Sequence, residues 1–494
     1  MISTQYPGVA SIRRVIPFPS RGEARTGARI DALGRFDAVI GAIERLMDFL
    51  AVVAGVWASN WAHAAWREQG GSHFSNEAVL TAAAGFALVM VLLLEKYGDY
   101  RPCLSLLAVR ETERLLRVAC TGALLGLPIL MALTKPTPWG AIILALATVP
   151  VLLALEKWQV QRAVWLLRRW RGATRKAVIL GTGTLGRKAF STLVHSPKLG
   201  IDPVAFVAAD ATVEEPVIYE SSYQHERHAQ VLRGPMTPRL LRKLGADVLI
   251  IADPEMASEV SNSIRCEAEA AGITTCVIPE PFLDDGVTTE YLEMDGVLLA
   301  YKVRRGDRWL YKTTKRAMDV ALSGLALLVF SPVFAVAAIA VKMTSPGPVI
   351  FRHQRVGRNG WLFTMYKFRS MYGNCATYSC SPLSGKDPRI TPVGRWLRHT
   401  CVDELPQLVN VLRGEMSLVG PRPEMPFIVE QYEAIHRKRL GVLPGLTGLW
   451  QLSADRRSPI HENIGYDLYY VQRRNLLMDV AILLHTLVFA CRGV

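Results

Sequence analysis

Long apolar stretches separated by short polar segments dominate the first third of the chain. Four of these stretches approach the roughly 20 residues that a helix needs to cross the hydrocarbon core of a bilayer. They lie at about 47–62, 78–94, 115–133 and 138–155. One stretch alone could be a buried core helix, but four in succession indicate a transmembrane region of four helices over 36–156. Residues 1–35 are polar, lack the apolar segment of a signal peptide, and predict a disordered tail.

Positive charge is concentrated on one side of these four stretches. The tail, the segment between the second and third stretches, and the residues after the fourth are all rich in Arg and Lys. The other two connecting segments, 63–77 and 134–137, carry only Arg67 and Lys135. Because Arg and Lys are retained on the cytoplasmic side of a membrane, the tail and everything after residue 156 are predicted to face the cytoplasm.

The pattern then changes to short apolar strands alternating with helical segments, which predicts a Rossmann-like α/β domain over 175–300. Gly181, Gly183 and Gly186 follow its first strand at the spacing of a dinucleotide-binding turn, and Asp210 ends the second strand. A glycine turn kept only for strand–helix packing has the same spacing. The cofactor signal is therefore weak, and NAD or another bound nucleotide is not expected.

A fifth apolar stretch, 317–343, is long enough to span a bilayer, but both of its flanks are basic. A crossing would place one basic cluster outside, against the charge bias. Ser331 and Pro332 stand near its middle. Proline removes a backbone donor and bends a helix, and a neighbouring hydroxyl can satisfy the freed backbone group. The stretch is predicted to be a re-entrant helix broken at this pair, with an ordinary kinked span as the alternative.

Composition and net charge indicate which kinds of partner the chain binds. The chain has 494 residues and a formal net charge of +14, which predicts two or three domains and anionic partners. The apolar stretches favour anionic lipid or phosphorylated substrates, and binding of nucleic acid is not expected because no recognised module is present. The eight cysteines show no repeated paired spacing, so reduced thiols are expected. Cys375, Cys380 and Cys401 lack a fourth ligand at a zinc-like spacing.

Two adjacent carboxylates, Asp403 and Glu404, stand in the polar segment after the broken stretch, just before Leu405-Pro406. Acids at a helix start are often simple caps. Basic side chains near them in the sequence, however, suggest a diphosphate pocket, since guanidinium groups bind phosphate oxygens in pairs. These candidates are Lys367, Arg369, Arg389, Arg395, Arg398 and Arg422. A carboxylate in such a pocket can attack phosphorus, and Mg²⁺ held by Asp403 and phosphate oxygens would offset the charge repulsion.

Several motifs in this part of the chain resemble those of the bacterial sugar transferase family, the monotopic phosphoglycosyl transferases. They are KFRSM, KDPRITPVGRWLR, DELPQLVNVLRGEMSLVGPRP and PGLTGLWQL. The match covers about 310–494. Over the first 300 residues the layout is similar to that of the large undecaprenyl-phosphate hexose phosphotransferases. The implied fold class is a membrane protein, α and α/β, with four transmembrane helices, a Rossmann-like domain, and a re-entrant helix joined to a mixed α/β catalytic domain over 310–494.

The resemblance implies transfer of a hexose-1-phosphate from a UDP-sugar to undecaprenyl phosphate in two steps, with Mg²⁺. Asp403 would attack the sugar-bearing phosphate with release of UMP, and the polyprenyl phosphate would then take the phosphosugar from the enzyme. Glu404 would position groups or handle protons, and Arg422 would engage phosphate. The reaction would start an exopolysaccharide, capsule or O-antigen repeat unit. It would occur at the bacterial inner membrane, on its cytoplasmic side, and a homodimer is left open.

One departure from the family pattern follows GLWQL, where Ser453-Ala454-Asp455-Arg456 replaces an expected Ser-Gly-Arg. Arg456 remains a phosphate-binding candidate. We expect the change to alter contacts with the sugar or the nucleotide and to leave the type of reaction unchanged.

Two other functions stay open. One is an inactive membrane scaffold or regulator, against which the acid pair argues. The other is a nucleotide-sugar dehydratase or epimerase, which needs NAD(P); the Tyr-x-x-x-Lys spacing at Tyr311 and Lys315 lies outside the middle domain and is treated as chance.

Overall fold

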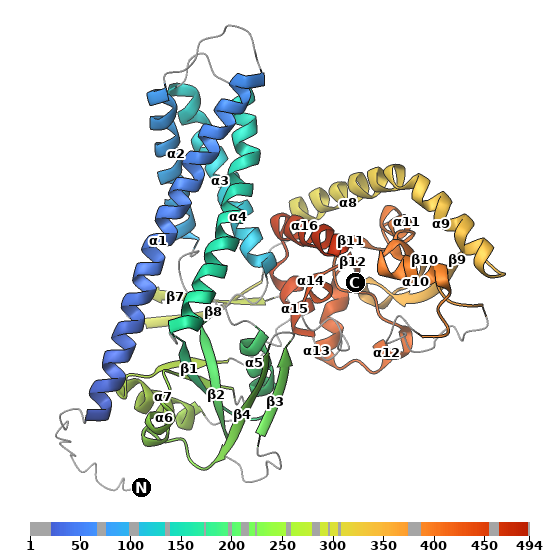
Figure 1. The fold of residues 1–494 in the computed structure, drawn as a ribbon. Helices are drawn as coiled ribbons and strands as arrows, with labels where there is room; N and C mark the ends of the chain where they lie inside the picture. Colours follow the sequence, from blue (N-terminus) through green and yellow to red (C-terminus); the bar gives the residue numbers. More distant parts are fainter. Residues whose placement is uncertain are drawn as a thin grey trace, which may run out of the picture. The chain divides into compact units, whose positions relative to one another are not determined.

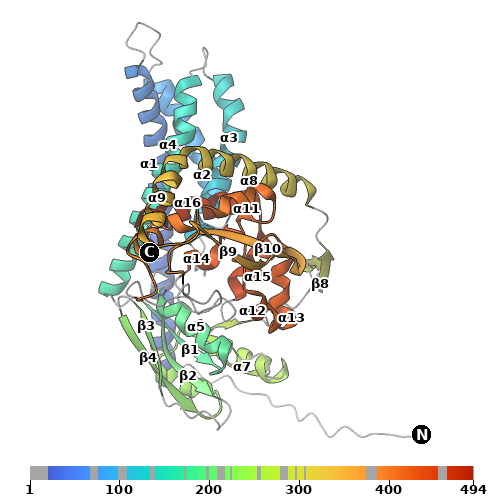
Figure 2. The same ribbon diagram turned by 90° about the vertical axis from the view of Figure 1, so that its right-hand side faces the viewer.

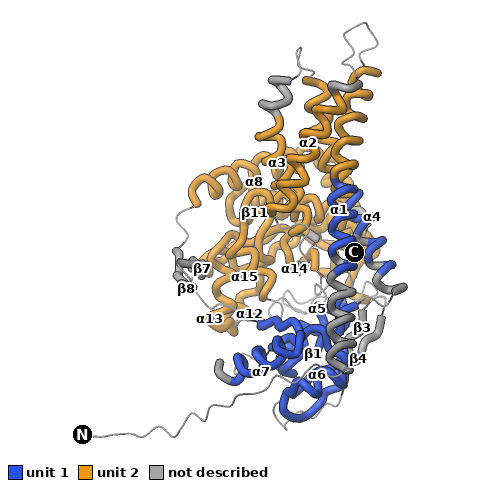
Figure 3. The backbone as a smooth tube through the Cα atoms, turned by 90° about the vertical axis from the view of Figure 1, so that its left-hand side faces the viewer, with its two compact units in different colours: residues 1–48, 156–280 blue, residues 49–155, 281–494 orange. Residues whose placement is uncertain are grey.

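The computed structural model is described here for most of the chain. The described ranges are 21–66, 76–97, 108–133, 139–171, 174–195, 200–208, 217–222, 225–252, 258–278, 287–294, 297–304, 308–373, 387–453 and 464–492. They divide into two compact units (Figure 3). The first unit contains residues 1–48 and 156–280, and the second contains residues 49–155 and 281–494.

Four long helices, α1 to α4, make up the first third of the chain (Figure 1). They are α1 (Arg21–Trp66), α2 (Asn76–Lys96), α3 (Ala108–Leu133) and α4 (Trp139–Arg171). The start of α1 at Arg21 falls inside the tail over 1–35 that the sequence predicts to be disordered. The first turns of α1 contain Ala24, Ala28 and Ala32, and alanine has the highest helix propensity, which favours this early start.

An apolar cluster joins these helices within the second unit. It includes Val52 of α1, Met90 and Leu94 of α2, Val118 of α3 and Val149 of α4, all nearly fully buried. Other large apolar side chains of the same helices remain exposed, as expected for helices that face lipid.

Two segments among the described helices are long and apolar enough to cross a bilayer, Val79–Lys96 in α2 and Trp139–Val164 in α4. The bent pair Trp309–Val329 and Ser331–Thr344 would make a third if it is a single span. The chain is therefore a membrane protein with two or three candidate spans. Polar residues interrupt the apolar part of α1, and the side chains at the end of α3 lie outside the described part of the chain, so four spans remain a prediction.

The middle of the chain forms a six-stranded sheet with the order β3-β4-β2-β1-β5-β6, in which only β3 runs antiparallel to its neighbour. The elements are β1 (Arg175–Leu180), α5 (Thr184–His195), β2 (Ile201–Ala208), β3 (Val217–Ser222), β4 (His225–Arg233), α6 (Pro238–Leu244), β5 (Val248–Ile251), α7 (Ser258–Ala270) and β6 (Thr274–Val277). Two apolar clusters bury the sheet, one containing Phe190 and Phe206 and the other Leu241 and Leu249. The predicted α/β domain is confirmed.

The rest of the chain belongs to the second unit and begins with the hairpin of β7 (Val287–Met294) and β8 (Val297–Arg304). The later elements are α8 (Trp309–Val329), α9 (Ser331–Thr344), β9 (Ile350–Val356), β10 (Leu362–Phe368), α10 (Pro392–His399), α11 (Gln407–Arg413), β11 (Ser417–Val419), α12 (Pro426–Glu430), α13 (Ala434–Arg437), β12 (Gly445–Thr447), α14 (Leu449–Leu452), α15 (Ile464–Arg473) and α16 (Leu476–Arg492). Their core contains Met365, Leu408, Val411, Val419 and Ile482.

Helices α8 and α9 form one bent rod (Figure 2). Their axes differ by 61°, and the bend falls at the Ser331-Pro332 pair, as the sequence predicts. Pro332 lies in the first turn of α9, where its missing N–H breaks no helical hydrogen bond. The Ser331 hydroxyl donates to the carbonyl of Leu328 at 2.8 Å and so satisfies an acceptor that the break leaves open. Exposed Leu328 and Ile339 leave both arms of the rod with apolar surface.

Candidate active site

The acid pair lies in a short 3₁₀ turn, Val402–Glu404, between α10 and α11. Helix α11 begins after Pro406, and neither acid caps it through a side-chain hydrogen bond, so the simple capping interpretation is not supported. Cys401, immediately before the turn, has a φ of 56° in the left-handed region that few side chains adopt. Backbone strain of this kind is typical of functional sites, where the surrounding fold holds a residue in place.

A fully buried amide fixes α11 against the strand that carries Lys367. The Asn410 Nδ2 group donates to the carbonyl of Thr364 at 2.7 Å, and its Oδ1 accepts from the backbone N–H of Tyr366 at 3.2 Å. Both partners belong to β10, in which Lys367 is the next residue. The acid pair and Lys367 are therefore held by one rigid strand–helix contact.

Two cations converge on one oxygen of Glu404. Lys367 Nζ lies 2.7 Å from Glu404 Oε1, and Arg422 Nη2 lies 2.9 Å from the same atom. Burial alone would raise the pKa of Glu404, but the charges of Arg422 and Lys367 and their hydrogen bonds hold it well below its usual range. Glu404 is therefore ionised at any pH at which the protein works, and it orients both cations.

Asp403 has the opposite environment, although it is the adjacent residue. Its side chain is buried, and burial followed by the charge of Glu404 raises its pKa to about 6. The charges of Lys367, Arg398 and Arg422 act in the other direction. Among the described residues, none donates a hydrogen bond to the Asp403 carboxylate, so its oxygens are available to a substrate. The two acids thus have different roles open to them.

Three of the predicted phosphate-binding side chains are brought to the acid pair, namely Lys367, Arg398 and Arg422. Arg398 reaches this place from α10, and its Nε donates to the Ser370 hydroxyl at 2.9 Å. Three cations therefore act on the Asp403 carboxylate, and guanidinium and ammonium groups of this kind bind the oxygens of a diphosphate.

The other predicted phosphate-binding residues are placed elsewhere. Arg369 is buried and donates to the carbonyls of Ser345 at 2.7 Å and Pro346 at 2.8 Å, so it caps the C-terminal end of α9. Arg389 forms a local two-point pair with Asp387, at 2.7 Å for Nη2 and Oδ2. The side chain of Arg395 is exposed on α10, and Arg456 lies outside the described residues.

The GPRP and PGLTG motifs, distant in sequence, pack against each other through glycine. Gly420 N donates to the carbonyl of Thr447 at 2.9 Å, and Gly445 N donates to that of Pro421 at 2.8 Å. A Cβ on Gly420 would lie 2.5 Å from the carbonyl oxygen of Leu443, and one on Gly445 would lie 2.1 Å from Gly420 N. Only glycine permits this approach, which sets the position of Arg422 two residues later.

We expect Gly420→Ala to destabilise the protein by about 3 kcal/mol, toward the upper end of the cost of overpacking, because the obstructing atoms are backbone. Displacement of the loop should also lower turnover through Arg422. Gly441→Ala is the matched control, since no atom lies within 4 Å of its added Cβ. Thermal unfolding of the two variants in detergent measures the difference, and equal melting temperatures would contradict the packing argument.

A buried ion pair supports the backbone of Arg422 and was not predicted from the sequence. Arg439 lies 2.9 Å from Asp467 through Nε, and its Nη2 donates to the carbonyl of Arg422 at 2.6 Å. Tyr432 also contacts Arg439 through its hydroxyl. The partners lie in separate helices and turns with no local motif, so the sequence carries no signal for them.

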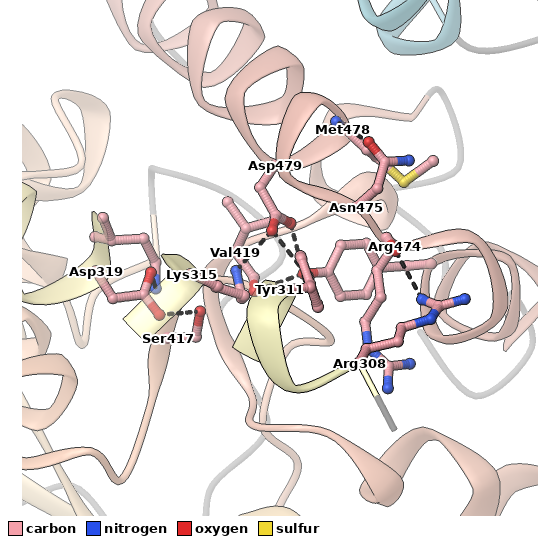
Figure 4. Close-up of polar contacts among 12 residues, drawn as sticks. Arg308, Tyr311, Lys315, Asp319, Ser417, Val419, Arg474, Asn475, Met478 and Asp479 are labelled. Atoms are coloured by element: carbon pink, nitrogen blue, oxygen red, sulfur yellow. Dashed lines mark hydrogen bonds and ion pairs between the residues drawn. The ribbon is translucent and has the colours of Figure 1, made fainter. Parts of the chain in front are cut away.

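A second buried network ties α8 to the strand that leads into GPRP (Figure 4). Asp319 accepts from the Ser417 hydroxyl at 2.7 Å and from the backbone N–H of Leu418 at 3.1 Å. A lone acid inside the apolar stretch 317–343 is a detectable signal for such a role, because buried acids in apolar helices normally have a partner.

A neighbouring set of polar contacts contains the Tyr-x-x-x-Lys pair (Figure 4). Tyr311 donates to Asp479 Oδ2 at 2.8 Å, and Lys315 Nζ lies 3.1 Å from that oxygen. The Tyr470 hydroxyl lies 2.7 Å from Asp479 Oδ1 and 3.0 Å from the carbonyl oxygen of Val419. Tyr311 and Lys315 therefore have a structural role in the second unit.

In the middle domain, packing accounts for two of the three fingerprint glycines. Gly181 has a φ of 104°, and a Cβ on Gly186 would lie 2.0 Å from the carbonyl oxygen of Gly181. Gly183 has no atom within 4 Å of its Cβ position, and Asp210 lies outside the described residues. Turn geometry and strand–helix packing thus explain Gly181 and Gly186 but not Gly183.

For a metal, the described ranges contain no cluster of three or more His, Cys, Asp or Glu side chains that could hold an ion. Glu404 is occupied by Lys367 and Arg422, whereas Asp403 has available oxygens. This donor set fits Mg²⁺ only together with substrate phosphate oxygens, which is a common arrangement for that ion.

Comparison with known proteins agrees with the geometry. Residues 310–493 match the family model described as bacterial sugar transferase. The chain is 32% identical over 383 residues to the undecaprenyl-phosphate galactose phosphotransferase of Salmonella typhimurium, a match that covers 68% of this chain and 76% of the relative. It is 37% identical over 224 residues to the UDP-glucose:undecaprenyl-phosphate glucose-1-phosphate transferase of Escherichia coli K12, covering 43% of this chain and 48% of the relative.

A shorter relative, the exopolysaccharide production protein ExoY of Sinorhizobium fredii, is 38% identical over 193 residues, which cover 36% of this chain and 85% of the relative. The family model covers the part of the chain that contains the acid pair and the cations around it. On these matches the chain belongs to the bacterial sugar transferase family and is a sugar-phosphate transferase.

Proposed function

We propose that this protein transfers a hexose-1-phosphate from a UDP-sugar to undecaprenyl phosphate, through a phosphosugar carried on Asp403, with release of UMP. The observation that supports this most directly is the contrast within the acid pair, where Glu404 binds two cations and Asp403 keeps its oxygens available. The relatives are named for undecaprenyl phosphate and for galactose, glucose or N-acetylgalactosamine transfer, so donor and acceptor class follow from them.

In the first step, an Asp403 oxygen attacks the phosphorus that bears the sugar. The bond from this phosphorus to the bridging oxygen breaks, and UMP leaves with the electron pair. Lys367 and Arg422, held by Glu404, stabilise the charge on the diphosphate as it is divided. No proton has to move in this step, provided that Asp403 is ionised.

In the second step, a phosphate oxygen of undecaprenyl phosphate attacks the same phosphorus. The bond to Asp403 breaks, which restores the carboxylate and gives the polyprenyl diphosphate sugar. The same cations can stabilise both steps, because the same phosphorus atom is attacked at the same position in each. Mg²⁺, held by Asp403 with phosphate oxygens, would neutralise part of the charge between carboxylate and substrate.

The membrane placement supports the choice of a lipid acceptor. Helices α8 and α9 carry exposed apolar side chains on both sides of a 61° bend and are tied to β11 and β10 by Asp319 and Arg369. We propose that this rod is re-entrant and holds the site at the cytoplasmic face of the inner membrane, where both substrates meet. The four predicted spans belong to the same proposal, and the product would start an exopolysaccharide or related repeat unit.

The activity should depend on pH through Asp403. Because its pKa is raised to about 6, the carboxylate is protonated below that pH and cannot attack phosphorus. We expect log(kcat/KM) to rise with unit slope up to about pH 6 and to be level above it. In Glu404→Gln the acid limb, which is the rising part of the pH profile, should move to lower pH, because the charge of Glu404 raises the pKa of Asp403. A wild-type limb near pH 4, the ordinary carboxyl range, would contradict this assignment.

The proposed reaction is tested with purified membranes that contain the full chain. UMP release is measured from a panel of UDP-sugars, with and without undecaprenyl phosphate. One UDP-sugar should support acceptor-dependent turnover, which would establish the reaction and identify the hexose together. Absence of UMP with every sugar, from folded protein supplied with Mg²⁺, would contradict the proposal and favour a scaffold.

A further inference from the structure

A second basic site lies in the second unit, away from the residues that form the candidate active site. It is a cavity of about 660 Å³ at the end of α2, lined also by α3, α8, α15 and α16. None of Lys367, Arg398, Asp403, Glu404 or Arg422 lines it. Its charge and its lining therefore need a separate explanation.

The lining contains six arginines and one carboxylate. The arginines are Arg110, Arg114, Arg117, Arg308, Arg473 and Arg474. The carboxylate, Glu113, lies 2.7 Å from Arg117 and accepts from Asn475 Nδ2 at 2.9 Å. Six guanidinium groups and one carboxylate line the cavity, and this excess of arginine in the lining suits the cavity to an anion.

Packing holds these arginines in place. Within α3, Arg110, Arg114 and Arg117 recur at helical spacing and share one face. The helix is fixed on α16 because the Thr112 hydroxyl lies 2.8 Å from His485 Nε2, in addition to the contact of Glu113 with Asn475.

On the opposite side, Arg308 donates from Nη1 to the carbonyl of Arg474 at 2.8 Å (Figure 4). Aromatic rings complete the wall, with Arg110 above Tyr469 at 6.0 Å and Arg117 above Tyr97 at 5.9 Å. Guanidinium groups held in place in this way can each bind two phosphate oxygens.

The remaining lining indicates what kind of phosphate would bind. Leu310, Leu476 and Met478 add apolar surface beside the arginines. Tyr97 directly follows the candidate span Val79–Lys96, so the cavity lies where that span ends. Basic pockets between helices at a membrane surface are typical binding sites for anionic lipid headgroups.

We propose that this cavity binds the phosphate group of an anionic phospholipid of the surrounding bilayer. The bound lipid would neutralise arginines from α3, α8 and α15 together and so stabilise the packing of the helical bundle against the catalytic part of the second unit. This inference does not rest on the proposed reaction, because its ligand and its residues are separate from the acid pair.

The test uses the full chain purified in neutral detergent without undecaprenyl phosphate. Phosphatidylglycerol and phosphatidylcholine are titrated separately, and lipid-bound protein is measured by native mass spectrometry. Wild type should bind phosphatidylglycerol at least tenfold more tightly, since a contribution of about 1 kcal/mol per arginine exceeds tenfold once two arginines take part. Equal binding of the two lipids would overturn the proposal without any variant.

Variants assign the preference to the cavity. Arg114→Gln combined with Arg473→Gln should weaken phosphatidylglycerol binding about 30-fold, from about 1 kcal/mol for each charge. Arg239→Gln with Arg265→Gln, on α6 and α7, removes the same charge elsewhere and should leave binding unchanged. Wild-type affinity in a folded cavity variant would overturn the assignment.

Inorganic phosphate distinguishes the source of the ligand. Added as a competitor, it should not displace phosphatidylglycerol at matched concentration, because it makes no contact with the apolar part of the lining. Displacement at matched concentration would overturn the lipid assignment and identify a site for soluble phosphate.

Discussion

Asp403→Asn is expected to lower acceptor-dependent formation of lipid-linked sugar by about 10⁴-fold or more, the usual cost of removing a catalytic nucleophile. The amide is nearly the same size as the carboxylate, so the fold of the 3₁₀ turn should persist. What is lost is the anionic oxygen that would attack phosphorus. Product is measured by extraction of radiolabelled polyprenyl diphosphate sugar from membranes.

The control for Asp403→Asn is Asp202→Asn, the same change in β2 of the middle domain, which should retain wild-type turnover. UDP-sugar binding by the Asp403→Asn protein should remain measurable, because Lys367 and Arg422 are unchanged. An Asp403→Asn chain that makes lipid-linked sugar at the wild-type rate would remove Asp403 from the mechanism.

Arg422→Gln should reduce kcat by about 10²- to 10³-fold, the usual effect of removing one fixed donor from a charged transition state. The change also leaves Glu404 with Lys367 alone. Because the charge of Arg422 lowers the pKa of Asp403, its loss should move the acid limb of the pH profile above pH 6. A purely structural role of Arg422 would lower turnover without moving this limb.

Arg265→Gln, which removes an arginine from α7 in the middle domain, is the control for this variant and should change neither turnover nor the pH profile. Together, the position of the acid limb and the loss in kcat separate electrostatic action at the acid pair from general destabilisation.

The proximity of Lys367 and Arg422 to the acid pair could be predicted from the sequence, because each stands in a short motif whose residue types suit phosphate chemistry. The bend at Ser331-Pro332 followed for a similar local reason, since proline affects the helix in which it stands. The α/β domain was predicted because its strands are short, apolar and separated by helices.

The positions of Arg369 and Arg389 could not be predicted from the sequence. Both are arginines in short polar motifs, as Arg422 is, yet one caps α9 and the other pairs with Asp387. The sequence shows the type of each side chain, but the tertiary fold determines which group that side chain contacts. Asp479 and Arg439 illustrate the same point, because their partners are far away along the chain.

The most direct test of the account is a search for the phosphosugar on the enzyme. The full chain is incubated with a UDP-sugar labelled in its sugar-bearing phosphate, without undecaprenyl phosphate, and acid-quenched protein is analysed by peptide mass spectrometry. We expect label on the peptide that contains Asp403, one UMP released per label, loss of the label when undecaprenyl phosphate is added, and no label in Asp403→Asn. Formation of lipid-linked sugar by an enzyme that never carries the label would contradict it.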